Sequence, residues 1–138
     1  MNLSFLKDKK ILITGHTGFK GIWLSLICNM YGAKVIGISK DLKNNKKFYN
    51  EIRHLNYKNY IFDMRDKNML KNILNNHKPN FIFHLAAQAL VVDSYIDPYE
   101  TFSNNFISSL NLLEACRKIN FKTNLVFITS DKSYKNVE

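Results

Sequence analysis

Residues 10–23 read KILITGHTGFKGIW: a short apolar segment, a glycine-rich turn and the start of an apolar helix. Gly15, Gly18 and Gly21 follow the pattern G-x-x-G-x-x-G, which is the dinucleotide-binding fingerprint G-x-G-x-x-G with one extra residue. In that motif the first glycine makes the turn, the second admits a phosphate to the main chain, and the third lets helix and strand pack closely. The helix that follows points unpaired N–H groups at the anion. The stretch therefore predicts a site for a dinucleotide pyrophosphate, although a glycine turn in another α/β protein would look similar.

Short apolar runs alternate with helical patterns along the rest of the chain. Strands are predicted at Lys10–Thr14, Lys34–Ser39, Asn59–Met64, Phe81–Ala86 and Asn124–Ser130. Helices are predicted at Gly18–Tyr31, Phe48–Leu55, the stretch after Asp66, and Tyr99–Ile119, with a long connection over Ala87–Asp97. Such alternation predicts an α/β fold: a Rossmann-type, doubly wound parallel sheet with strand order 3-2-1-4-5, truncated after the fifth strand.

The composition is that of a globular domain of ordinary size, with 138 residues of which 46% are hydrophobic. Twenty Lys and Arg against 11 Asp and Glu give a net charge of +9, which would suit an anionic partner. The basic residues are scattered rather than clustered, so we expect no nucleic-acid partner. A basic nucleic-acid binder remains an alternative, and it would show steep salt dependence of DNA binding.

Several classes of protein are disfavoured by what the sequence lacks. Cys28 and Cys116 are far apart and form no C-x-x-C pair, so we expect two reduced thiols and no metal site. Met1–Lys10 has no apolar core of the kind found in signal peptides, and the longest apolar run, 22–28, is too short to cross a bilayer. We therefore expect a cytoplasmic protein that does not enter a membrane.

The ends of the second and third strands carry charged residues where ligands bind in doubly wound sheets. Asp41 would bind ribose hydroxyls and favour NAD, whereas Lys40 would favour the 2′-phosphate of NADP. Asp41 could equally be a solvated loop carboxylate. Asp63 could accept a hydrogen bond from an adenine amino group, or it could simply cap a helix or form a salt bridge near Arg65.

The ends of the fourth and fifth strands complete the predicted site. The small side chains of Ala86 and Ala87 would let a ligand lie against the backbone. His84 lies inside the strand and is interpreted as a structural histidine. Residues 130–132 offer a hydroxyl, a carboxylate and an amine, which suit proton transfer and charge stabilisation, although a polar strand-to-loop turn would also contain them.

Four segments together resemble the extended short-chain dehydrogenase/reductase superfamily, and within it the CDP-glucose 4,6-dehydratases: GHTGFKGIWLSL, HLAAQALV, DPYETFSNN and TSDKSY. The resemblance covers nearly the whole chain. It implies NAD as a hydride shuttle: hydride leaves the sugar C4, water is lost across C5 and C6, and the hydride returns to C6. CDP-glucose would thereby become CDP-4-keto-6-deoxyglucose, a precursor of deoxysugars in surface polysaccharides.

The resemblance also assigns roles to individual residues. The implied cofactor-binding residues are Gly15, Thr17, Gly18 and Phe19 at the phosphate turn, Asp63 and Met64 at the adenine, and Ala86, Ala87 and Gln88 at the nicotinamide. The glycine fingerprint adds Gly21, and the end of the second strand adds Asp41 at the ribose. The implied catalytic residues are Ser130, which would hold the C4 hydroxyl, Asp131, the acid for loss of the C6 hydroxyl, and Lys132, near C5.

Two departures from the superfamily stand out. Ser108 and Ser109 replace the usual Gly-Thr pair after Asn105, and no tyrosine in the chain is followed four residues later by lysine. We therefore interpret residues 1–138 as an incomplete NAD(P)-binding domain that lacks its substrate domain and is inactive alone. The complete enzyme would be a homo-oligomer that acts on a sugar nucleotide. The alternatives are a non-enzymatic NAD(P)-binding module and a remnant of another nucleotide-sugar epimerase or dehydratase.

Overall fold

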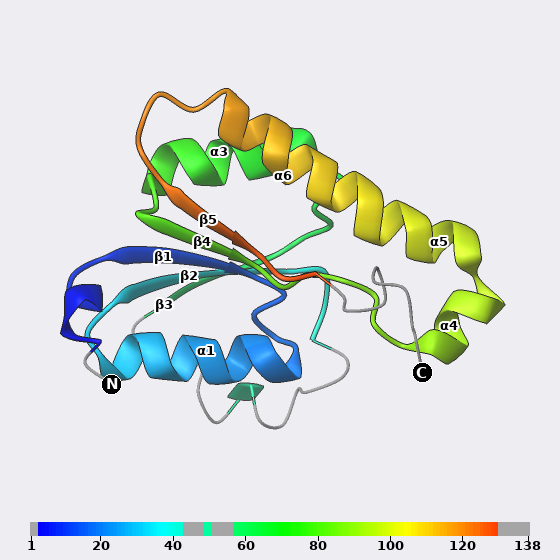
Figure 1. Ribbon diagram of the computed structural model, residues 1–138, viewed down its shortest axis with the longest axis horizontal. Coiled ribbons are helices and arrows are strands. Elements are labelled where there is room, and N and C mark those ends of the chain that lie inside the picture. The colour runs from blue at the N-terminus through cyan, green and yellow to red at the C-terminus, as the bar shows by residue number, and fades with distance from the viewer. Residues whose placement is uncertain (1–2, 43–48, 51–56, 130–138) are drawn as a thin grey trace, which may run out of the picture.

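The computed structural model describes residues 3–42, 49–50 and 57–129. At its centre lies one five-stranded parallel sheet with strand order β3-β2-β1-β4-β5, which confirms the predicted topology. Helix α1 covers one face of the sheet, and α3 and α6 cover the other (Figure 1). The strands are β1 Lys10–Thr14, β2 Lys34–Ser39, β3 Tyr57–Ile61, β4 Phe81–His84 and β5 Asn124–Phe127.

The helical elements agree with the predictions in part. They are η1 Ser4–Leu6, α1 Phe19–Met30, α3 Lys67–His77, α4 Val91–Ile96, α5 Pro98–Phe102, the π-helical turn η2 Ser103–Ile107, and α6 Ser108–Arg117. The prediction that 87–97 is a connection was partly wrong, since this stretch contains α4. The helix was missed because all its residues are at least partly exposed, so its sequence shows no buried stripe. The predicted helix 99–119 is interrupted by η2 and ends two residues early. The predicted helix Phe48–Leu55 lies almost entirely outside the described residues.

Three strands have boundaries that differ from the prediction, because a strand extends as far as its pairing with a neighbour and not as far as its apolar residues. β3 starts two residues earlier than predicted, at Tyr57, which pairs with Val35 of β2. It ends at Ile61, and the chain then turns, with Asp66 N–H donating to the Asp63 carbonyl at 2.9 Å. β4 and β5 both end earlier than predicted because their mutual pairing stops at the His84 and Phe127 register position.

The core lies on both faces of the sheet, because alternate residues of β1 point in opposite directions. Leu12 packs on the face covered by α3 and α6, with Leu70, Leu74 and Leu112. Ile11 and Ile13 pack on the α1 face, with Leu6, Cys28, Ala33 and Val35. The near-continuous apolar runs in the sequence are therefore those of parallel strands buried on two sides.

The ends of the helices are fixed as the sequence indicates. Gly32, at φ 77°, closes α1: its N–H donates to Asn29 and the N–H of Ala33 donates to Cys28, the hydrogen-bond pair of a Schellman motif. The carboxylate of Asp66 accepts from the first amides of α3. Because the helices end and begin at these residues, the chain returns to the sheet after each helix, and the next strand has its carboxyl end at the same edge.

Candidate functional site

A pocket of about 400 Å³ lies beyond the carboxyl ends of the strands. It brings together segments from the phosphate turn and from the ends of β2, β3 and β4. Nine of the eleven predicted cofactor-binding residues line it: Gly15, Thr17, Gly18, Asp41, Asp63, Met64, Ala86, Ala87 and Gln88. The other two, Phe19 and Gly21, belong to the first turn of α1, where Phe19 is 69% exposed and Gly21 is buried.

Two of the glycines are required by close backbone contacts. Gly15 has φ 73°, and a Cβ there would lie 2.8 Å from the backbone nitrogen of Ala86. A Cβ on Gly21 would collide with the carbonyl oxygen of Gly15 and with Cα of His16. Gly15 therefore lets the turn approach β4, and Gly21 lets α1 approach the turn.

Gly18 is the N-cap of α1 and also lines the pocket. No side chain among the described residues caps this helix end, so none competes for its first amides. Thr17 fixes the turn to the end of β2: its N–H donates to Ser39 Oγ at 3.1 Å and its hydroxyl donates to the Asp41 carbonyl at 2.9 Å. This arrangement of a helix N-terminus facing a pocket fits an anion such as a pyrophosphate.

His84 lies beneath the pocket as a buried structural histidine, 2% exposed. Its Nδ1 is 2.7 Å from the hydroxyl of Thr14, and its Nε2 is 2.9 Å from the hydroxyl of Ser109. Because burial disfavours the imidazolium, the pKa of His84 is lowered to about 4. Thr14 in turn accepts from the N–H of Ala86, so this chain of hydrogen bonds positions the backbone that lines the pocket.

The loop after β4 is held by Asn105 of η2. The Asn105 side chain accepts from the backbone N–H of Gln88 at 2.7 Å and donates to the Gln88 carbonyl at 3.0 Å. The side chain of Gln88 turns back to Leu90 and Thr101. No role was predicted for Asn105 from the sequence, where it served only to locate Ser108 and Ser109. Nothing in the spacing of residues 88 and 105 indicates that they are in contact.

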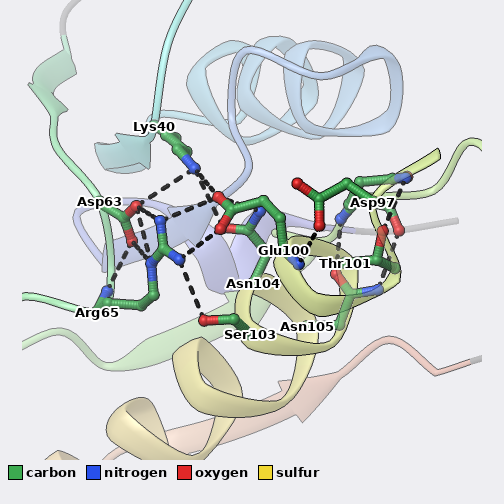
Figure 2. A network of polar contacts seen from close by, with 10 residues as sticks. Lys40, Asp63, Arg65, Asp97, Glu100, Thr101, Ser103, Asn104 and Asn105 are labelled. Carbon is green, nitrogen blue, oxygen red and sulfur yellow. Dashed lines mark hydrogen bonds and ion pairs between the residues drawn. The ribbon is translucent and has the colours of Figure 1, made fainter. Parts of the chain in front are cut away.

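Four charged side chains form a network at the rim of the pocket, shown in Figure 2. Arg65 binds both carboxylate oxygens of Asp63, which is the pairing that the sequence offered as the alternative for Asp63. Arg65 also donates to both oxygens of Glu100, at 2.8 and 3.0 Å. Lys40 Nζ lies 2.7 Å from Glu100 and 3.4 Å from Asp63. Two positive and two negative charges thus join the ends of β2 and β3 to α5.

These contacts keep the network ionised. The hydrogen bonds from Arg65 lower the pKa of Asp63 to about 2, and those from Arg65 and Lys40 lower the pKa of Glu100 to about 2. The Glu100 carboxylate raises the pKa of Lys40. Sequence reasoning missed Glu100 because it lies 35 residues from Arg65 and 60 from Lys40, and only folding brings them together.

The predicted catalytic residues Ser130, Asp131 and Lys132 lie outside the described residues. The strand before them, β5, runs parallel to β4, so its carboxyl end is at the same edge of the sheet as the phosphate turn.

Within the described ranges, no group of three His, Cys, Asp or Glu side chains is placed to hold a metal. None of the helices in those ranges has the length and apolar character needed to cross a membrane.

The family model described as GDP-mannose 4,6 dehydratase matches residues 12–138. The chain belongs to the GDP-mannose 4,6-dehydratase family. It is 42% identical over 137 residues to the CDP-glucose 4,6-dehydratase of Salmonella typhimurium, and these residues are 98% of this chain and 38% of that protein. The chain therefore spans well under half the length of this relative.

Solved structures to which the chain is similar share the fold. A UDP-glucose 4-epimerase from Thermotoga maritima, solved with UDP-glucose, is 35% identical with a TM-score of 0.75, covering 86% of this chain and 37% of that one. A UDP-glucose 4-epimerase from Thermus thermophilus, solved in complex with NAD, is 32% identical with a TM-score of 0.70, covering 79% of this chain and 34% of that one. The described fold is thus that of the N-terminal portion of these dehydratases and epimerases.

Proposed function

We propose that this chain is the NAD-binding portion of a nucleotide-sugar 4,6-dehydratase. The observation that carries the proposal is the pocket itself, which brings together a glycine turn, a helix N-terminus that no side chain of the described residues caps, and the ends of β2, β3 and β4. This is where dinucleotides bind in doubly wound sheets. The NAD complex of the Thermus relative supports the identity of the cofactor.

The residues present fit such a ligand. The pyrophosphate would lie at Gly15–Gly18, where no side chain in the described part of the chain caps the amides at the start of α1. The adenine would lie at Asp63 and Met64, and Asp41 would bind the ribose hydroxyls. The backbone over Ala86–Gln88, fixed by Asn105, would hold the nicotinamide side. The bound cofactor would supply a hydride acceptor.

The substrate that we propose for the complete protein is CDP-glucose, as in the Salmonella relative. Ser130 would orient the C4 hydroxyl, Asp131 would donate a proton to the leaving C6 hydroxyl, and Lys132 would stabilise negative charge near C5. Residues 1–138 lack a tyrosine followed four residues later by lysine, so we expect the chain alone not to turn over CDP-glucose. Turnover by the purified chain would contradict this part of the proposal.

A nucleotide-sugar epimerase is the second candidate, because UDP-glucose 4-epimerases share the same fold.

Cofactor binding can be tested with Gly18→Ala. Among the described residues, a Cβ at this position would meet only the Gly15 carbonyl oxygen, at 3.2 Å, so the chain should fold, while the added methyl obstructs the phosphate site. We expect calorimetric titration to show NAD+ binding by the unmodified chain and at least ~10-fold weaker binding by the variant. The matched control is Met30→Ala, at the far end of the same helix and 81% exposed, which should bind normally. Absence of NAD+ binding, or equal binding by both variants, would contradict the proposal.

We also propose that the protein self-associates in the cytoplasm. Helices α4 to α6 expose a run of large apolar side chains, each at least 47% exposed: Val91, Val92, Tyr95, Ile96, Tyr99, Phe102, Phe106, Leu110 and Leu113. An apolar surface of this extent is typical of an interface, and a second copy is the occupant that we infer. Sedimentation velocity should show a dimer or larger assembly that Tyr95→Lys weakens, and a monomer at every concentration would contradict self-association.

A further inference from the structure

The charge network at the pocket rim has a feature that the dinucleotide proposal does not use. Lys40 is the first residue after β2, and in this fold the 2′ position of the adenosine ribose lies at the end of that strand. A lysine there would suit the 2′-phosphate of NADP+, which carries about two negative charges. Lys40 lines the pocket and its side chain is 47% exposed, so it has access to a ligand.

Glu100, however, already engages this lysine. Its carboxylate lies 2.7 Å from Lys40 Nζ, and the same carboxylate accepts two hydrogen bonds from Arg65. The side-chain amide of Asn104 donates to Glu100 at 3.0 Å and fixes the carboxylate further. Glu100 itself lines the pocket, so it places a negative charge at the rim, where it pairs with both Lys40 and Arg65.

We propose that Glu100 determines the preference of this pocket for NAD+ over NADP+. By holding Lys40 and Arg65 in ion pairs, the carboxylate withdraws both cations from a 2′-phosphate and repels that phosphate directly. A 2′-hydroxyl carries no charge and is unaffected by this repulsion. The inference rests on the proposed dinucleotide site, and it assigns the choice between the two cofactors to a residue of α5 rather than to the end of β2 alone.

The test is the ratio of the dissociation constants for NADP+ and NAD+ in Glu100→Gln. The amide has nearly the same shape as the carboxylate but no charge, so the four-residue network changes from neutral to a charge of +1. We expect the ratio to shift toward NADP+ by at least ~10-fold, because like-charge repulsion is removed and Lys40 loses the shorter of its two ion pairs, keeping only the 3.4 Å pair with Asp63. Adding Lys40→Gln to this variant should return the ratio to within ~3-fold of the unmodified chain.

Two controls separate this effect from a general change of charge or shape. Glu114→Gln removes an equivalent carboxylate on α6, which pairs with Arg117 and with Lys118 just beyond the helix and does not line the pocket, so the ratio should not change. Glu100→Asp keeps the charge and should stay within ~3-fold of the unmodified ratio, whether or not Glu100→Gln folds well.

The outcomes distinguish this inference from the function on which it rests. Failure of the unmodified chain to bind either dinucleotide contradicts the proposed function. Binding of NAD+ with an unchanged ratio in Glu100→Gln, an equal shift in Glu114→Gln, or a ~10-fold shift in Glu100→Asp overturns the role of Glu100 and leaves the dinucleotide site standing.

Discussion

The stability of this chain should fall as the pH drops from neutral toward 5, and His84 should account for much of the loss. The buried His84 ring is neutral in the folded chain, with a pKa of about 4 against 6.5 when unfolded. The unfolded chain therefore takes up a proton at a higher pH than the folded chain. The stability that the neutral ring contributes is complete above about pH 6.5 and is lost as the pH falls through about 4.

The size of the effect follows from the difference between these two pKa values. It corresponds to about 3 kcal/mol once the pH is below both values, and about 2 kcal/mol of this is lost by pH 5. Solvent does not screen this contribution to the free energy of unfolding appreciably, because His84 is only 2% exposed. The carboxylates of Asp63 and Glu100, whose pKa values are lowered to about 2, stay charged in the folded chain at pH 5.

The assay is urea unfolding followed by far-UV circular dichroism at about pH 7.5 and about pH 5. We expect His84→Asn, which does not titrate, to lose about 2 kcal/mol less between these pH values than the unmodified chain. His77→Gln is the control, because His77 is only partly buried and hydrogen-bonds Tyr60 on another part of the sheet. Equal losses in His84→Asn and the unmodified chain would refute a neutral, buried His84.

Three substitutions test other parts of the structure. Gly21→Ala places a methyl group against the Gly15 carbonyl, so urea unfolding should show a loss of about 1–3 kcal/mol, with weaker NAD+ binding; unchanged stability would mean that the turn is not packed as described. Asp66→Ala removes the acceptor for two amides of α3 and should reduce stability by about 1 kcal/mol, with NAD+ affinity preserved. Asn105→Ala leaves the N–H and C=O of Gln88 without their partners and should weaken NAD+ binding several-fold in calorimetry, whereas unaltered affinity would exclude a positioning role.

Much of the fold could be predicted because it depends on local signals. The apolar run Lys10–Thr14 followed by Gly15 predicts a buried strand and a turn, and both are present. Gly32 and Asp66 end and begin helices where their backbone and side-chain chemistry indicates. The boundaries of β3, β4 and β5 could not be predicted as well, because each strand ends where its neighbour stops pairing.

The candidate site, too, could be predicted only in part from the sequence. Its phosphate turn and the small residues after β4 could be predicted, because close backbone approach restricts which residues can occupy these positions. The roles of Asn105 and Glu100 could not, because each depends on a partner that is distant in the chain.

Apolar periodicity and the backbone freedom of glycine were enough to predict the order of strands and helices, the phosphate turn and the residues at the ends of the strands. Which charges pair with one another, in contrast, depends on the folded chain. Asp63 had two interpretations in the sequence, and Lys40 was expected to favour the 2′-phosphate of NADP. In the folded chain Glu100 of α5 pairs with both Lys40 and Arg65 at the rim. Ion pairing depends on distances of a few ångströms between side chains, and these exist only after the sheet has brought remote segments together.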